Sequence, residues 1–148
     1  MHFFKSVMLN KQDCLNLLYV DLGNQEVYPA AEYILGYLFD LKKTKQNFIP
    51  LSRFIKTTRD KFGDRFTNSE IFRVTQYFCG ERVSLLNTKF EFIDDFDTCY
   101  ELTAHEAIEA LQLGVFYHPE SGEQINTPED SIFMFFKPSE ELESYLNG

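Results

Sequence analysis

The side chains that could carry out chemistry are few and widely spaced along the chain. The chain has three histidines and three cysteines, which are His2, His105, His118, Cys14, Cys79 and Cys99. Cys99 and His105 are six residues apart, and a thiol beside an imidazole is a possible nucleophile–base pair. A strand-to-helix junction is expected between them, so their spacing does not bring them together. We therefore predict no catalytic residues and a protein that is not an enzyme.

The sequence also gives no signal for a metal or a cofactor. No two cysteines form the Cys-x-x-Cys pair that is typical of zinc and redox sites. Asp94, Asp95 and Asp97 cluster in the segment IDDFD, and carboxylates of this kind can bind a divalent cation. The segment lacks the spaced ligands and closing glutamate of an EF-hand loop, so a solvated acidic turn is the simpler interpretation. Phosphate-loop, nucleophile-elbow and zinc-protease motifs are also missing from the sequence.

Charge is distributed very unevenly along the chain, whose formal net charge is −9 at pH 7. Residues 41–89 carry eleven Lys and Arg against four Asp and Glu, whereas residues 90–148 carry one Lys against fourteen Asp and Glu. An acidic total disfavours nucleic acid as a partner, although a local basic region can still attract phosphates. The pattern leaves open whether the basic 41–89 region is exposed or is covered by the acidic C-terminal third.

The elements that must position these residues follow from hydrophobic spacing. Apolar side chains recur at helical spacing in residues 29–44 and 50–63, and Gly63 follows the second segment as a helix end. Lys42, Lys43 and Lys45 are expected near the end of the first helix. Residues 10–22 begin with a candidate N-cap, Asn10, but the same segment could form a strand and a turn.

Two capping boxes mark helix starts, because each combines a threonine with a glutamate three residues later. Thr67 and Glu70 predict a helix over 68–79, and Thr103 and Glu106 predict one that ends before Gly114. Residues 82–94 are expected to form either two short strands about Asn87-Thr88 or one long bent strand. A strand-turn-strand segment at 115–125, a strand at 131–136 and a helix at 138–146 complete the expected elements.

Three helices followed by a hairpin over about 29–96 resemble a winged-helix domain. The resemblance rests on the order of the elements, and it implies that helix 68–79 is the recognition helix and that the following hairpin is the wing. We therefore predict an α+β fold with a winged-helix-like core and a small C-terminal α/β extension at about 97–148. All of residues 1–148 are expected to form a single domain.

The resemblance also implies a nucleic-acid surface. Ser69, Arg73 and Gln76 share the face of helix 68–79 opposite its apolar stripe, and Arg and Gln can read guanine and adenine edges. The residues expected to contact phosphates are Arg53, Lys56, Arg59, Lys61 and Arg65. The alternative is an ordinary solvated helix face, which Glu70 on the same helix favours.

The function that best fits these observations is a non-enzymatic protein–protein interaction module. It would act as an adaptor or as a subunit of a larger assembly, with a protein partner or a second copy of itself. The alternative is a winged-helix DNA-binding transcriptional regulator that uses helix 68–79 and the basic 41–89 region. The sequence has no apolar run of about 18 residues and no leader pattern, so we predict a cytoplasmic protein that does not contact membranes.

Overall fold

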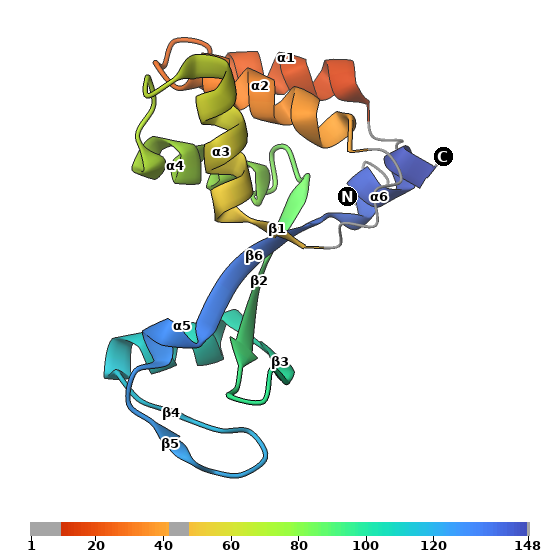
Figure 1. The fold of residues 1–148 in the computed structure, drawn as a ribbon. Coiled ribbons are helices and arrows are strands. Elements are labelled where there is room, and N and C mark those ends of the chain that lie inside the picture. Colours follow the sequence, from red (N-terminus) through yellow and green to blue (C-terminus); the bar gives the residue numbers. More distant parts are fainter. Residues whose placement is uncertain (1–9, 42–47, 148) are drawn as a thin grey trace. The chain divides into compact units, whose positions relative to one another are not determined.

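The computed structural model describes residues 10–41 and 48–147 and has an α+β fold (Figure 1). The helices of these residues are α1 (Lys11–Leu22), α2 (Tyr28–Phe39), α3 (Leu51–Phe62), α4 (Asn68–Phe78), α5 (Ala104–Leu113) and α6 (Glu140–Asn147). The strands are β1 (Ile49–Pro50), β2 (Leu86–Ile93), β3 (Cys99–Leu102), β4 (Phe116–Tyr117), β5 (Gln124–Ile125) and β6 (Ile132–Pro138), and η2 (Pro128–Asp130) is a short 3-10 helix. The predicted α+β class is confirmed.

The chain divides into two compact units, and unit 2 interrupts unit 1. Unit 2 is Thr88–Phe135, and unit 1 comprises the described residues up to Asn87 together with those from Phe136 onwards. The boundaries therefore fall within β2 and β6, not at the predicted start of a C-terminal extension near residue 97. The larger sheet has the strand order β1-β6-β2-β3, and β4 pairs with β5 in a separate sheet. The single-domain organisation over residues 1–148 stays a prediction.

Unit 1 is built around helices α1 to α4, which form one group in Figure 1. α1 starts because the Asn10 side chain accepts hydrogen bonds from the amides of Gln12 and Asp13, which settles residues 10–22 as a helix. α2 carries Pro29 in its first turn and ends at Phe39, earlier than predicted. Lys42, Lys43 and Lys45, which were expected near its end, lie outside the described residues. The apolar stripe expected for α2 is buried throughout and consists of Ala31, Ile34, Leu35, Leu38 and Leu41.

Aromatic rings fill the centre of unit 1. Phe54 of α3 is fully buried, and its ring meets those of Tyr37 and Phe136 edge-on at centroid distances of 6.0 and 5.7 Å. α3 ends at Gly63, which has a φ of 67°, a left-handed conformation that glycine adopts without steric cost. The C-terminal helix α6 starts at Ser139, whose hydroxyl donates to the Ser84 carbonyl and accepts from the Leu142 amide.

Both predicted capping boxes are present. The Thr67 hydroxyl accepts from the Glu70 amide at 3.1 Å, and the Glu70 carboxylate accepts from the Thr67 amide at 2.9 Å. Thr103 and Glu106 reproduce the same two hydrogen bonds at the start of α5, with the same distances. These contacts satisfy amides that the helix itself leaves unpaired.

Removing either capping threonine should therefore weaken the protein measurably. We expect Thr67→Ala and Thr103→Ala each to lower the free energy of unfolding by about 1 kcal/mol, because each removes an acceptor from a helix amide. Denaturant titration measures the loss, with Ser144→Ala on the exposed face of α6 as the control. If both variants keep the wild-type free energy of unfolding, these hydrogen bonds contribute nothing to stability.

Unit 2 consists of the β2–β3 hairpin from residue 88 of β2 onwards, the β4–β5 hairpin, helix α5 and residues 132–135 of β6. β2 is one continuous strand, and it pairs antiparallel with β3 so that Phe92 faces Tyr100. The turn of this hairpin is therefore at residues 94–98, and the alternative of two short strands about Asn87-Thr88 is wrong. β4 pairs with β5 across a turn that contains Gly122, whose φ is 75°. The buried residues of its small core are Phe92, Leu102, Ala107, Ala110 and Ile132.

Candidate functional site

The predicted reading residues of α4 do lie together on the surface of unit 1. Ser69, Arg73 and Gln76 are exposed on the side of the helix opposite its buried stripe. With Glu70 and Phe72 they line a shallow hollow of about 280 Å³. No hydrogen bond or ion pair engages these three side chains within the described part of the chain. The structure thus brings this half of the predicted site together.

The predicted phosphate-contacting residues are mostly engaged inside unit 1. Lys56 pairs with Asp60 at 3.0 Å, and Arg59 donates a 2.6 Å hydrogen bond to the side chain of Asn68. The Lys61 ammonium and the Arg65 guanidinium lie over aromatic rings, at 6.0 Å from the centroid of Tyr33 and 5.1 Å from that of Phe66. Arg53 is half-buried on α3. A phosphate would have to compete with these contacts.

A further basic residue of the middle region, Arg82, is neutralised by α1. Two of its nitrogens donate to the two carboxylate oxygens of Asp21, at 3.0 and 2.8 Å, and the Tyr77 hydroxyl donates to the same carboxylate at 2.6 Å. The hydrogen bonds from Arg82 and Tyr77 lower the pKa of Asp21. Burial and the bond to Asp21 raise the pKa of Tyr77. This network fastens α4 to α1 and was not apparent from the sequence, because its members are far apart along the chain.

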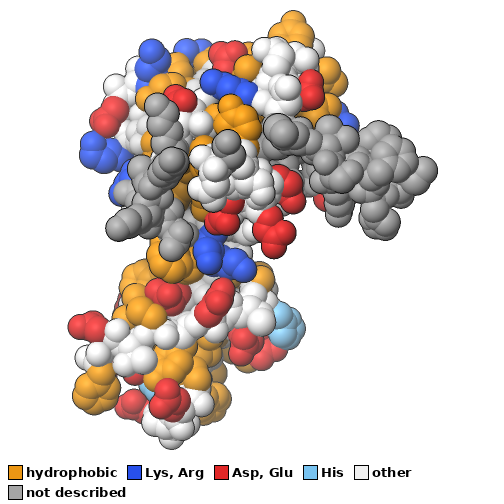
Figure 2. All heavy atoms as spheres, turned by 90° about the vertical axis from the view of Figure 1, so that its right-hand side faces the viewer, with side chains coloured by type: hydrophobic (Ala, Val, Ile, Leu, Met, Phe, Trp, Pro, Cys, Tyr) orange, Lys and Arg blue, Asp and Glu red, His pale blue; other side chains and the backbone are white. Residues whose placement is uncertain are grey.

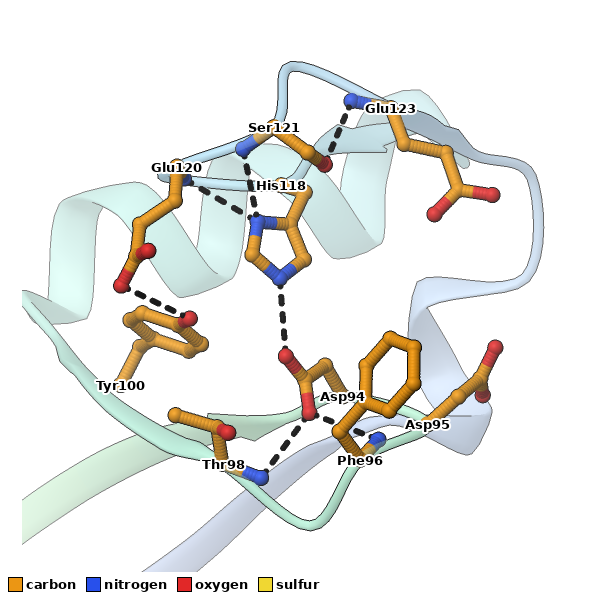
Figure 3. A pocket seen from close by; sticks show the side chains of 9 residues that line it. All are labelled: Asp94, Asp95, Phe96, Thr98, Tyr100, His118, Glu120, Ser121 and Glu123. Carbon is orange, nitrogen blue, oxygen red and sulfur yellow. Dashed lines mark hydrogen bonds and ion pairs between the residues drawn. The ribbon is translucent and has the colours of Figure 1, made fainter.

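Unit 2 contains a larger pocket, of about 540 Å³, between the turns of its two hairpins (Figure 3). One wall is the 94–98 turn that joins β2 to β3, and the other is the turn that joins β4 to β5. The residues that line it are Asp94, Asp95, Phe96, Thr98, Tyr100, His118, Glu120, Ser121 and Glu123. Four of them are acidic, which are Asp94, Asp95, Glu120 and Glu123.

His118 is held at both of its ring nitrogens. Its Nδ1 accepts from the backbone amides of Glu120 and Ser121 at 3.0 and 3.1 Å. The proton of the neutral ring therefore resides on Nε2, which donates to the carboxylate of Asp94 at 2.9 Å. The side chains of both partners are about nine-tenths buried, with 11% and 9% of their surfaces exposed. An imidazole bonded in this way has no lone pair available for general-base catalysis or for a metal.

Asp94 serves the same structural purpose on the opposite wall. Its second carboxylate oxygen accepts from the amides of Phe96 and Thr98, both at 2.9 Å, and so fixes the 94–98 turn. The Tyr100 hydroxyl donates to Glu120 at 3.0 Å and adds a second link between the hairpins. Asp94 and His118 are separated by 24 residues, and no spacing rule connects residues that far apart in sequence. The predicted acidic turn is present, and Asp95 and Asp97 in it are exposed as expected. Asp94 is not solvated, because its side chain is buried against His118, a partner of which the sequence gave no sign.

The Asp94 contacts should make stability depend on pH in the acid range. The hydrogen bond from His118, followed by those from Thr98 and Phe96, lowers the pKa of Asp94. The folded chain therefore keeps this carboxyl ionised where the unfolded chain already binds a proton. Its stabilisation is complete above the ordinary Asp pKa of about 3.9 and is lost as the pH falls through the lower folded-state value.

We accordingly expect the free energy of unfolding of the wild type to fall as the pH is lowered from about 5 to about 2. Asp94→Asn should be less stable at neutral pH and should show a smaller fall over the same interval, because its side chain cannot bind the proton. Urea titrations at a series of pH values measure both slopes. Equal slopes for the two proteins would contradict the assigned hydrogen bonds.

None of the three cysteines, all of which lie in the described residues, forms a disulfide. Cys14 is buried in α1, where burial and the neighbouring Asp13 raise the pKa of its thiol to about 11. Cys79 is half-buried and Cys99 is exposed. Within residues 10–41 and 48–147, no group of three or more His, Cys, Asp or Glu is arranged to hold a metal ion.

The number and spacing of the cysteines predict a fold that needs neither a metal nor a disulfide. We expect the melting temperature of the purified protein to be unchanged by a chelator or by a reductant, because packing and capping supply the stability. Calorimetric scans of treated and untreated samples make the comparison. A large fall in melting temperature with either reagent would contradict this expectation.

Helix α5 of unit 2 carries an apolar strip that is exposed to solvent. The α5 strip consists of Ala104, Ile108 and Leu111, and the exposed fractions of the last two are 48% and 43%. Unit 2 as a whole is acidic, because it contains one Lys and eleven Asp and Glu. In Figure 2, hydrophobic and acidic side chains stand next to one another on the lower part of the molecule, which is unit 2.

Comparisons with known proteins add no relative. No protein-family model, no curated protein and no solved structure matches the chain. The comparisons therefore do not test the winged-helix resemblance, which stays a prediction from the order of the elements. No helix in the described part of the chain is long and apolar enough to cross a membrane.

Proposed function

We propose that the protein is a cytoplasmic, non-enzymatic protein–protein interaction module, an adaptor or a subunit of a larger assembly. The observation that carries the proposal is the exposed α5 strip on an acidic unit. Apolar side chains that lie side by side on an exposed helix face form a surface that a partner can cover. Burying such surface contributes about 25 cal/mol per Å² of apolar area removed from water, which favours association.

The chemistry of the unit 2 pocket supports binding over catalysis. In the described part of the chain, the buried pair of His118 and Asp94 links two turns, and both ring nitrogens of His118 are occupied by those links. The exposed His105 lies 3.5 Å from the carboxylate of Glu109 on the same helix. A general base needs an available nitrogen within reach of a substrate proton, and neither arrangement offers one.

The test is affinity purification of the tagged full-length chain, with and without nuclease. We expect a specific protein to remain bound after nuclease treatment, and reconstitution from purified components should reproduce the complex. Sedimentation of the purified chain alone determines whether that partner is a second copy. Loss of all bound protein after nuclease treatment would count against the proposal.

A second candidate function is DNA binding through α4, as the winged-helix resemblance implies. It is favoured by one observation, the common exposure of Ser69, Arg73 and Gln76 around the hollow on α4. Combined reversal of Arg73, Lys56 and Lys61 to glutamate should then abolish binding to duplex DNA measured by fluorescence anisotropy. Wild-type affinity should also fall steeply with salt, because each phosphate contact releases counterions.

We expect the DNA experiment to give little affinity at about 150 mM salt, where the Debye length is about 8 Å. Most of the basic side chains of unit 1 that this function needs are already engaged by neighbouring groups, and the chain as a whole is acidic. Tight, sequence-dependent binding by the wild type would replace the first proposal with the second.

A further inference from the structure

We infer that the α5 strip binds a partner segment that is both apolar and basic, such as one face of a cationic amphipathic helix. The inference rests on the proposed protein–protein function and names the chemistry of the partner. Two independent features of unit 2 carry it: the incomplete coverage of the apolar side of α5, and the negative net charge of the unit as a whole.

Only part of the apolar side of α5 packs against the unit 2 core. Ala107 and Ala110 face the unit 2 core and are 0% and 4% exposed. Residues 104, 108 and 111 form a sector of about 60° directly beside them. The two buried residues are small, so they anchor α5 closely, while the larger Ile108 and Leu111 remain outside. An amphipathic helix of a soluble protein normally turns its large apolar residues inward, and α5 does the reverse.

The charge of unit 2 selects the partner. Its single lysine, Lys89, already lies 3.9 Å from the carboxylate of Glu101, so the eleven acidic residues have almost no internal compensation. A second copy of the same face would bring like charges together, which is unfavourable. DNA and anionic lipid surfaces would be repelled for the same reason. A basic segment gains both attraction at long range and burial of the strip on contact.

The spacing of the strip sets the kind of contact. Side chains at i, i+4 and i+7 line one side of a helix for about two turns, which is the length over which another helix packs with its own i, i+3, i+4 anchors. The expected contact is therefore one short helical segment with two or three apolar anchors and flanking Lys or Arg.

The probe is a synthetic helical peptide of leucine and lysine whose leucines occupy one face. The matched probe has the same composition in scrambled order, so it keeps the charge but loses the apolar face. Methyl NMR spectra of the full-length chain should show that the amphipathic peptide shifts the signals of Ile108 and Leu111. The scrambled peptide should bind at least tenfold more weakly, and the affinity of the amphipathic peptide should fall as salt is raised.

Two substitutions on α5 test whether the peptide binds the α5 strip itself or any exposed apolar side chain of the helix. Ile108→Asp should weaken binding of the amphipathic peptide at least tenfold, because it places a charge in the strip. Leu113→Asp should leave binding unchanged, since Leu113 is also exposed, at 68%, but lies on the other side of the helix. Circular dichroism and urea titration should show that both variants keep the wild-type fold and stability.

Several outcomes would overturn the inference. Equal binding of the two peptides would show attraction by charge alone, and equal effects of the two variants would place the contact elsewhere. If the wild type is a dimer and Ile108→Asp dissociates it, the α5 strip binds a second copy of the chain instead. A marked loss of stability in Ile108→Asp would mean that the strip is packed within the chain. A protein partner that is captured but does not need the α5 strip would refute this inference and leave the proposed function standing.

Discussion

Phe54→Ala is expected to cause the largest loss of stability of any single substitution considered for this protein, about 3 to 5 kcal/mol in the free energy of unfolding. Phe54 is fully buried, and its ring packs edge-on against Tyr37 and Phe136. The substitution removes the transfer free energy of the ring and leaves a cavity among groups that cannot collapse onto it, because they belong to separate elements. The loss should appear as a lower denaturant midpoint and as reduced amide protection in unit 1.

The matched control is Phe72→Ala in the same unit. Phe72 is 36% exposed on α4, so its removal should cost well below half as much as the loss at Phe54. Since the chain has two compact units, hydrogen exchange should be followed residue by residue rather than as one transition. Comparable losses for the two phenylalanines would contradict the assigned core of unit 1.

His118→Ala is expected to lower the free energy of unfolding by about 2 to 3 kcal/mol, with the loss concentrated in unit 2. Removing the ring deprives two backbone amides of their acceptor and Asp94 of its donor, and a buried polar group left without a partner is costly. It also removes the ring that packs against Phe92 and Tyr100 at centroid distances of 5.6 and 5.1 Å. Hydrogen exchange at residues 94–98 and 118–123 should accelerate most.

His105→Ala is the matched control, because it replaces the same residue type in the same unit. The side chain of His105 is 85% exposed and its contact with Glu109, at 3.5 Å, lies on the surface, so the change should lie within about 0.5 kcal/mol. A double-mutant cycle with Asp94→Asn isolates the link itself. If the effects of His118→Ala and Asp94→Asn simply add, the two side chains are not coupled and the proposed link between the hairpins is wrong.

The helix starts were the most predictable part of this protein, because each depends on residues that are close in sequence. Asn10, Thr67, Thr103 and Ser139 each accept a hydrogen bond from an amide two or three residues further on. The apolar stripe of α2 repeats at helical spacing within a dozen residues, and its burial was likewise predictable. Interactions of this range require no knowledge of the remainder of the chain.

The strands were less determined by sequence. Residues 82–94 allowed two short strands or one long one, and the choice depended on the 94–98 turn, which is fixed by hydrogen bonds of Asp94 to two amides. Lys56, Arg59, Lys61 and Arg65 formed a basic group in the sequence, whereas the structure engages each with a neighbouring acid, amide or ring. The sequence gives the positions of the charged residues, but it does not show which groups their side chains contact in the fold.

The sequence by itself therefore determined the α+β class, the helix starts and the concentration of acid towards the C-terminus. Only the tertiary structure decided that Thr88–Phe135 forms its own unit, that Asp94 and His118 meet across 24 residues, and that the α5 strip is left uncovered. The physical reason is the range of the interactions. Caps and helical stripes form between residues a few positions apart, whereas burial and partner choice depend on which distant segments pack together, and hydrophobic periodicity is the same whether an apolar sector is covered or exposed.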